Sequence, residues 1–67
     1  MNTHAYFAKV AEFVDFQLSW GTRPTMIAAH LQVTDVQDVV TLLSVWQFND
    51  TATRLYDAWQ TQRKALA

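Results

Sequence analysis

The side chains that most often carry out chemistry are sparse in this sequence and stand far apart. The two histidines are His4 and His30, and no acidic residue stands at a helical spacing from His4 that suggests a metal-binding pair. Ser19 and Ser44 lack the context of a catalytic nucleophile, and the chain has neither a Gly-rich phosphate loop nor an H-E-x-x-H motif. The sequence therefore predicts a protein that is not an enzyme, with no metal or cofactor site.

The carboxylates Asp35 and Asp38 stand one helical turn apart, which is a spacing that acid–base catalysis can use inside a pocket. Both also stand at the start of a predicted helix, where a negative charge stabilises the positive end of the helix dipole. A chain of 67 residues has little room for a cleft that excludes water. We therefore interpret both residues as helix-start residues.

The composition describes one small domain, residues 1–67, whose core must be stabilised by packing alone. There is no cysteine, so the chain can form neither a disulfide nor a thiolate metal site. The chain is 51% hydrophobic and has three Trp, four Phe and two Tyr, which is much apolar surface for a sphere of this size. Self-association would use that surface. The alternative is a monomer that exposes a few apolar groups, as many proteins do.

Charge and hydropathy give no sign of a nucleic-acid or membrane partner. The net charge is −1, so no overall field attracts the chain to phosphates or to anionic lipid. No apolar run approaches the length that spans a bilayer. The first residues lack the basic start and apolar stretch of a signal peptide, so the default expectation is a cytoplasmic protein.

The spacing of apolar residues predicts an all-α fold, a compact bundle of about four helices. The chain has one Gly and one Pro, too few for a fold built on tight β-turns. Gly21 suits a helix C-terminus and Pro24 suits the first turn of the next helix, where Thr22 or Arg23 would be the cap. The predicted helices cover residues 3–20, 24–31, 34–48 and 51–65.

The third helix is the element around which we expect the others to pack, because it is apolar around most of its circumference. Thr34 and Gln37 match a capping box at its start. The stretch Val33–Val45 is also rich in Val and Thr, which favour strands. Apolar residues at 36, 39, 40 and 43 fit a helix better than they fit alternation.

The short helix 24–31, the turn Gln32-Val33-Thr34 and the longer helix 34–47 resemble the helix-turn-helix of DNA-binding regulators. The resemblance covers about residues 22–46. With Ala28 as the family's small residue, Leu31 and Val33 fit, but Gln32 replaces the turn Gly and Asp38 replaces a buried aliphatic residue. With Ala29 in that role, Val39 and Leu42 fit, but Val33 replaces the Gly and Gln32 replaces a buried aliphatic residue.

If that resemblance holds, helix 34–47 is the recognition helix, and the candidate DNA contacts are Arg23, Gln37, Thr41 and Ser44. The charge opposes it, because Asp35 and Asp38 would approach the phosphates while residues 22–48 contain a single Lys or Arg side chain. Basic groups from elsewhere in the chain, such as Arg54 or Arg63, would have to compensate.

A protein-binding surface is the third interpretation. One stripe of the first helix turns toward the core, and a second, largely aromatic stripe then has no partner. Two apolar residues of the third helix also have no partner within the bundle. The candidate interface residues are Tyr6, Phe13, Phe16, Trp20, Leu42 and Val45. We therefore predict a non-catalytic interaction module that associates with itself or with another protein; the alternative is the helix-turn-helix regulator.

Overall fold

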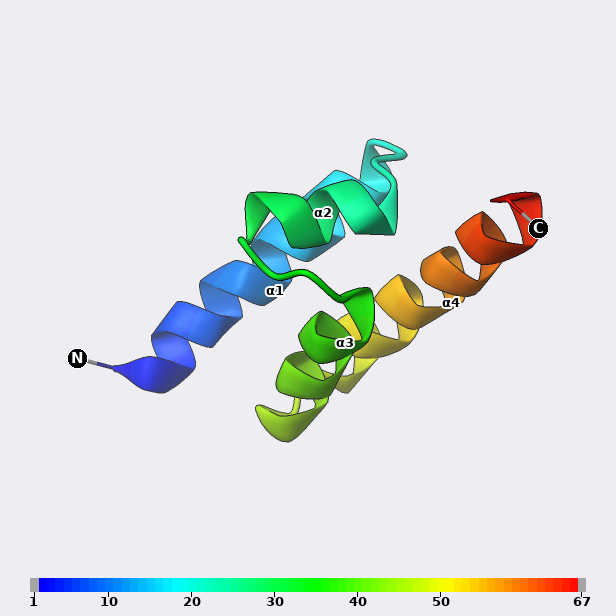
Figure 1. The fold of residues 1–67 in the computed structure, drawn as a ribbon. Coiled ribbons are helices and arrows are strands. Elements are labelled where there is room, and N and C mark those ends of the chain that lie inside the picture. The colour runs from blue at the N-terminus through cyan, green and yellow to red at the C-terminus, as the bar shows by residue number, and fades with distance from the viewer. Residues whose placement is uncertain (1, 67) are drawn as a thin grey trace.

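Four helices make up most of residues 2–66, which are the residues described in this computed structural model (Figure 1). They are α1 (Thr3–Ser19), α2 (Pro24–His30), α3 (Val36–Val45) and α4 (Asn49–Leu66). No strand occurs among the described residues, so the predicted all-α class is confirmed. The stretch with the competing strand signal is helical from Val36 onward.

The first three helices all end in the same way, with a residue in the left-handed conformation directly after the cap. These residues are Gly21, Gln32 and Gln47, with φ of 80°, 59° and 68°. At each one the next residue donates its N–H to the carbonyl five positions back; Phe48 N to Leu43 O, at 2.8 Å, is the shortest of the three. This is the Schellman motif, which satisfies helix-end carbonyls that otherwise have no partner.

The third helix is shorter than predicted at both ends. Its cap is Asp35, whose Oδ1 accepts from Gln37 N at 2.9 Å, so the predicted capping box at Thr34 is wrong. The side-chain oxygen of Asp35, one residue after Thr34, accepts from a free N–H group at the helix start, which is the role that Thr34 was expected to have. The helix ends at Val45, and the left-handed Gln47 turns the chain so that α4 begins at Asn49.

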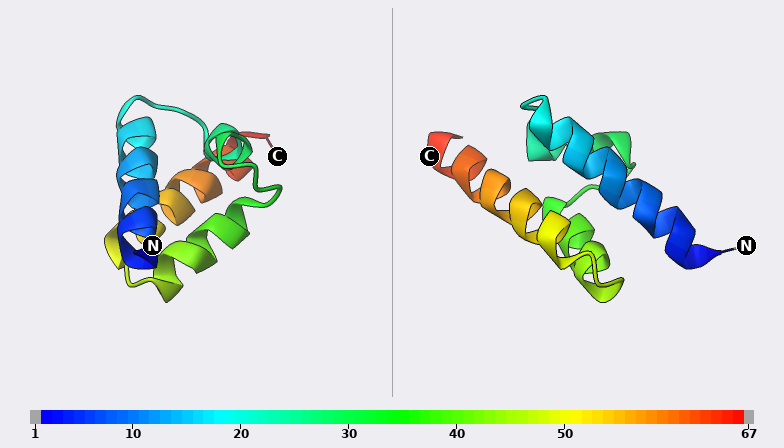
Figure 2. Two further views of the ribbon diagram at one scale, coloured as in Figure 1. Left: turned by 90° about the vertical axis from the view of Figure 1, so that its left-hand side faces the viewer. Right: turned by 180° about the vertical axis from the view of Figure 1, so that it is seen from behind.

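The central element is α4, and our expectation that helix 34–48 would be central is wrong. Along its length α4 packs against each of the other three helices, whereas α1 and α3 approach each other least. When the molecule is viewed from the left-hand side of Figure 1, α1, α2 and α3 lie along three sides and α4 runs behind them (Figure 2). In this arrangement α1 and α3 make little contact with each other.

The buried core is made of small and medium aliphatic side chains from all four helices. Its largest fully buried side chains are Ile27, Leu43, Leu55 and Val14. None of the nine aromatic side chains, all within the described residues, belongs to the buried set. Several aromatics instead pack around the edge of the core, including Phe13, Phe48 and Trp59.

One polar cluster joins α1 to α4. Asp15 accepts from the buried hydroxyl of Thr51 at 2.9 Å, and from Arg54 Nη2 at 2.7 Å and Nε at 3.1 Å. A carboxylate that accepts several bonds from α4 favours one rotation of α1 about its own axis.

The last turns of α4 extend away from the other helices (Figures 1 and 2). Tyr56, next to the buried Leu55, and Leu66, in the last turn, are both exposed. Gln62 holds this end to α2, since its Nε2 donates to Thr25 Oγ1 at 2.8 Å.

Candidate interaction surface

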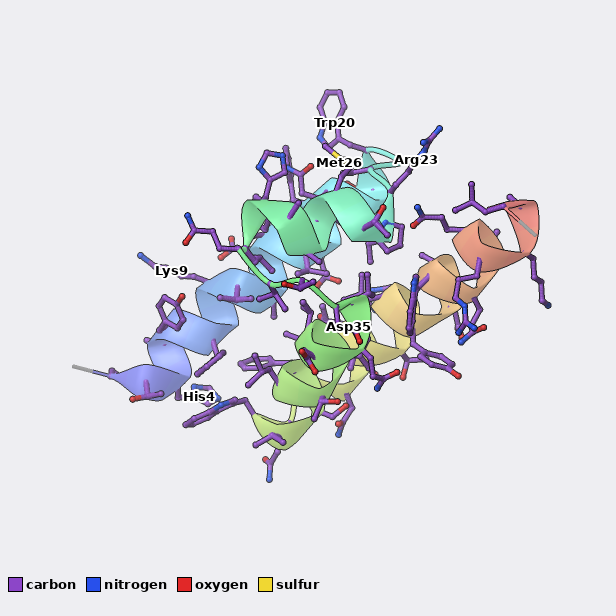
Figure 3. All side chains as sticks on the ribbon, viewed as in Figure 1. His4, Lys9, Trp20, Arg23, Met26 and Asp35 are labelled. Atoms are coloured by element: carbon purple, nitrogen blue, oxygen red, sulfur yellow. The ribbon has the colours of Figure 1, made fainter. Side chains whose placement is uncertain are left out.

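The side of α1 that faces away from the core carries large, exposed aromatic side chains. Tyr6 is 59% exposed, Phe16 57% and Trp20 74%, and the ring centroids of Phe16 and Trp20 lie 5.9 Å apart. Figure 3 shows Trp20 and Lys9 pointing away from α4. We call Tyr6, Phe13, Phe16 and Trp20 the outer face of α1.

Phe13 is the most enclosed member of the outer face. It is partly buried, packs against the edge of the core, and meets the ring of His30 edge-on at 6.3 Å. Its position next to α2 means that the domain itself supplies part of the partner we expected from outside. A shallow, open depression begins beside it, lined by Lys9, Glu12, Phe13 and Phe16.

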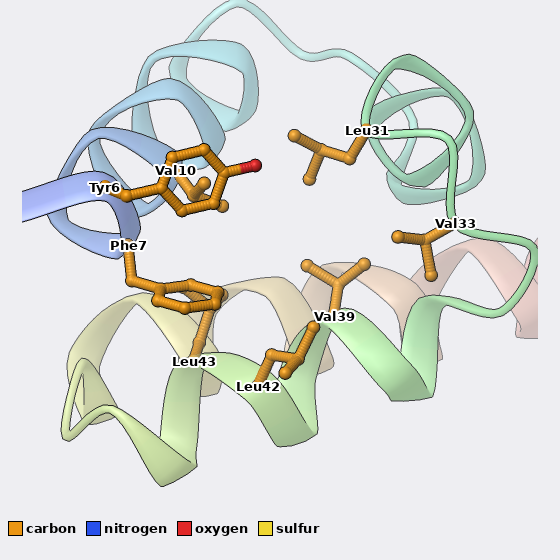
Figure 4. Close-up of a pocket in the computed structure, with 8 residues that line it drawn as sticks. All are labelled: Tyr6, Phe7, Val10, Leu31, Val33, Val39, Leu42 and Leu43. Carbon is orange, nitrogen blue, oxygen red and sulfur yellow. The ribbon is translucent and has the colours of Figure 1, made fainter. Parts of the chain in front are cut away.

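A second apolar feature is a groove of about 70 Å³ between α1 and α3 (Figure 4). We call it the α1–α3 groove. It brings Tyr6 and Leu42, two of the predicted interface residues, to the same opening. Its lining is Tyr6, Phe7, Val10, Leu31, Val33, Val39, Leu42 and Leu43.

The contact between α1 and α3 is made by long side chains near the ends of the helices. Phe7 stacks on Trp46 with ring centroids 4.8 Å apart and an interplanar angle of 17°. His4 packs against Phe48 at 5.3 Å. Sequence spacing within one helix cannot reveal a stack between two helices, so this contact was not predicted.

On α3, Leu42 is 42% exposed and Val45 68% exposed, so neither has a full partner within the described residues. Leu42 continues the surface of Tyr6 across the α1–α3 groove. Met26 of α2 is also exposed, and the sequence interpretation did not include it. The inward residues of α2 are Ile27, Ala28 and Leu31. This pattern places Met26 on the outward side, so it could have identified Met26 as an exposed residue.

The candidate DNA-contacting residues do not form one cluster. Gln37, Thr41 and Ser44 are exposed on α3, and Gln37 Nε2 lies 3.4 Å from Thr41 Oγ1. Arg23 stands at the start of α2 and points away from the first turn of α3, where Asp35 lies (Figure 3). No Lys or Arg therefore accompanies these three residues on α3 itself.

The histidines pack against aromatic rings, and residues 2–66 contain no group of three or more His, Asp or Glu side chains arranged to hold a metal ion. Within the same residues, no helix combines the length and apolarity that crossing a membrane requires. No buried side-chain N or O atom in this part of the chain lacks a hydrogen-bond partner.

No family model matches this chain. Comparisons with curated proteins and with solved structures likewise find no match.

The outer face offers aromatic rings, one ammonium group and one carboxylate, Lys9 and Glu12, at its edge. Rings that are held at one end and open at the other bind by burial, stacking and cation–π contact. These are interactions for holding another molecule against α1.

Proposed function

We propose that this chain is a small, non-catalytic interaction module that associates with itself through the outer face of α1. The observation that carries this proposal is the distribution of side chains by size. Aliphatic residues fill the core, while three large aromatics of one helix remain more than half exposed. Aromatic residues are enriched among the side chains that dominate the energy of protein interfaces.

The exposed apolar side chains extend beyond α1. Leu42 lies across the α1–α3 groove from Tyr6, and Val45 lies three residues further along α3. Large exposed apolar patches are uncommon on free monomers and usually mark a binding site, so the number of these exposed residues supports the proposal. The net charge is only −1, so long-range electrostatic attraction to a partner is weak. This favours association through burial of apolar surface.

The test is the mass in solution across a concentration series, by light scattering or sedimentation, at low and at high salt. We expect a dimer at both salt concentrations, because burial of apolar surface is not screened by ions. Phe16→Ser should shift the equilibrium to monomer. Tyr56→Ser is the matched control, since Tyr56 is an exposed aromatic on α4 and its loss should leave the mass unchanged. A strict monomer at every concentration would overturn self-association.

The second candidate is a helix-turn-helix DNA-binding regulator, and the exposure of Gln37, Thr41 and Ser44 on α3 favours it. A DNA binder should bind duplex with an affinity that falls steeply as salt rises. Replacing Asp35 and Asp38 by Asn should strengthen that binding, because two charges that repel phosphates are removed. The Asn at position 35 still caps the helix, so the variant should remain folded. No binding of duplex at low salt would exclude this candidate.

A further inference from the structure

We infer that two copies of this chain pair through α1 in antiparallel orientation, with Lys9 of one copy against Trp20 of the other. This inference rests on the proposed function and specifies its geometry. It follows from three properties of α1: the spacing of the side chains on its outer face, the shape between them, and the position of one charge.

The spacing is that of a helix that packs along another helix. Tyr6, Phe13 and Trp20 recur every seven residues, and Lys9 and Phe16 stand between them at alternating steps of three and four. A repeat of 3.5 residues keeps one stripe of a helix facing a partner helix over its whole length. The inner face of α1 already packs on the domain, and on the second stripe Phe13 is partly covered by His30 while Tyr6, Lys9, Phe16 and Trp20 are exposed to a partner.

The shape agrees with the spacing. The depression lined by Lys9, Glu12, Phe13 and Phe16 is bounded by residues i, i+3, i+4 and i+7 of one helix. Four residues at those positions form the hole that receives a side chain from a facing helix. Phe16, which projects from the same face, is a side chain suited to such a hole. One face thus supplies both the hole and the side chain, as a symmetric contact between identical copies requires.

The charge decides the orientation. In a parallel pair Lys9 would face Lys9 of the second copy, two like charges within an apolar seam, which is unfavourable. In an antiparallel pair Lys9 of each copy can instead lie over the exposed ring of Trp20, so that symmetry produces two cation–π contacts. The same alignment brings Phe13 opposite Phe16. The chain already contains a contact of this type, with Arg63 5.0 Å from the centre of the Trp59 ring.

The orientation can be measured directly, because the chain has no cysteine of its own. A spin label at Thr3→Cys, in the exposed first turn of α1, should report a backbone separation of about 35 Å in the antiparallel dimer, from 1.5 Å per residue. A parallel dimer would place the same sites at about 10 Å. A label at Glu12→Cys is the control, because position 12 lies near the middle of the seam and should give a short separation in both arrangements.

The register is tested by a double-mutant cycle on the dimer dissociation constant, with Lys9→Gln, Trp20→Leu and the double variant. Within one copy these residues are about 16 Å apart along the helix, so they can interact only across the dimer. Two cation–π contacts predict that the double variant is weakened by about tenfold less than the product of the two single effects. Lys64→Gln with Trp20→Leu is the matched control and should show no coupling.

The outcomes separate the two proposals. A dimer with the long separation at position 3 and with coupling between Lys9 and Trp20 supports the antiparallel pair. A dimer with the short separation, or without coupling, overturns the orientation or the register and leaves self-association standing. A monomer at all concentrations overturns both.

Discussion

The fully buried apolar residues of α1 are small, and its most exposed apolar residues are large. The inner face buries Ala11 and Val14 against the other helices, and the outer face exposes the much larger rings of Phe16 and Trp20. If folding alone determined the sequence, the largest apolar side chains would gain most from burial. The opposite arrangement is the one expected if the outer face binds a second copy, as proposed.

On α3, adjacent residues of the same size differ in environment. Leu43 is fully buried, whereas Leu42 stands at the mouth of the α1–α3 groove. Residues of identical chemistry therefore contribute to different properties, one to folding and one to the exposed surface. Substitutions on the two sides should consequently affect different measurements.

The largest expected difference between the two faces comes from placing a charge on each. Val14→Asp buries an unpaired carboxylate, and a domain of this size has a stability of only about 3–10 kcal/mol, so it should unfold. Phe16→Asp should leave the far-UV circular dichroism spectrum unchanged and abolish the dimer. A folded Val14→Asp variant would contradict the assignment of the inner face.

The neighbouring leucines of α3 give a comparison without a change of charge. Leu43→Ala should lower the free energy of unfolding by about 2–5 kcal/mol, because a buried cavity is created. Leu42→Ala should lower it by less than about 1 kcal/mol, since the side chain is already partly solvated. Denaturant unfolding at a protein concentration where the chain is monomeric measures both. Equal losses would mean that the α1–α3 groove closes in solution.

Asp15 lies between the two faces and joins α1 to α4. Asp15→Ala removes the acceptor of the buried Thr51 hydroxyl, and we expect a loss of about 1–3 kcal/mol in unfolding free energy. Arg54→Ala should cost less than about 1 kcal/mol, because its ion pair with Asp15 is largely exposed. If the two variants lose the same stability, the ion pair rather than the Thr51 bond holds the rotation of α1.

The smallest effects concern the turns that orient the helices. Gly21→Ala should cost about 1 kcal/mol through its positive φ alone, because nothing lies within 4 Å of the added methyl group. Gln47→Gly removes the same strain and should stabilise the domain by up to about 1 kcal/mol. Thermal unfolding should shift in opposite directions for the two variants. A shift in the same direction would show that flexibility of the unfolded chain dominates.

The sequence alone was sufficient to predict the number, type and approximate limits of the helices. The apolar spacing in residues 3–20 and 51–65, together with Gly21 and Pro24, is local information that acts within a few residues. The left-handed conformation of Gln32 and Gln47 could not be predicted from this local information. Their left-handed conformation is enforced by the helix ends and by the packing of the residues that follow, and Gln gives no signal for it.

The tertiary structure decided which helix is central and which apolar stripe remains exposed. Both stripes of α1 are apolar in sequence, and the hydrogen bonds of Asp15 to α4 contribute to the choice of which one turns inward. Packing of α4 against all three other helices holds α1 and α3 apart and leaves the α1–α3 groove between them. These outcomes depend on contacts between residues distant in sequence, and periodicity within a single helix carries no information about them.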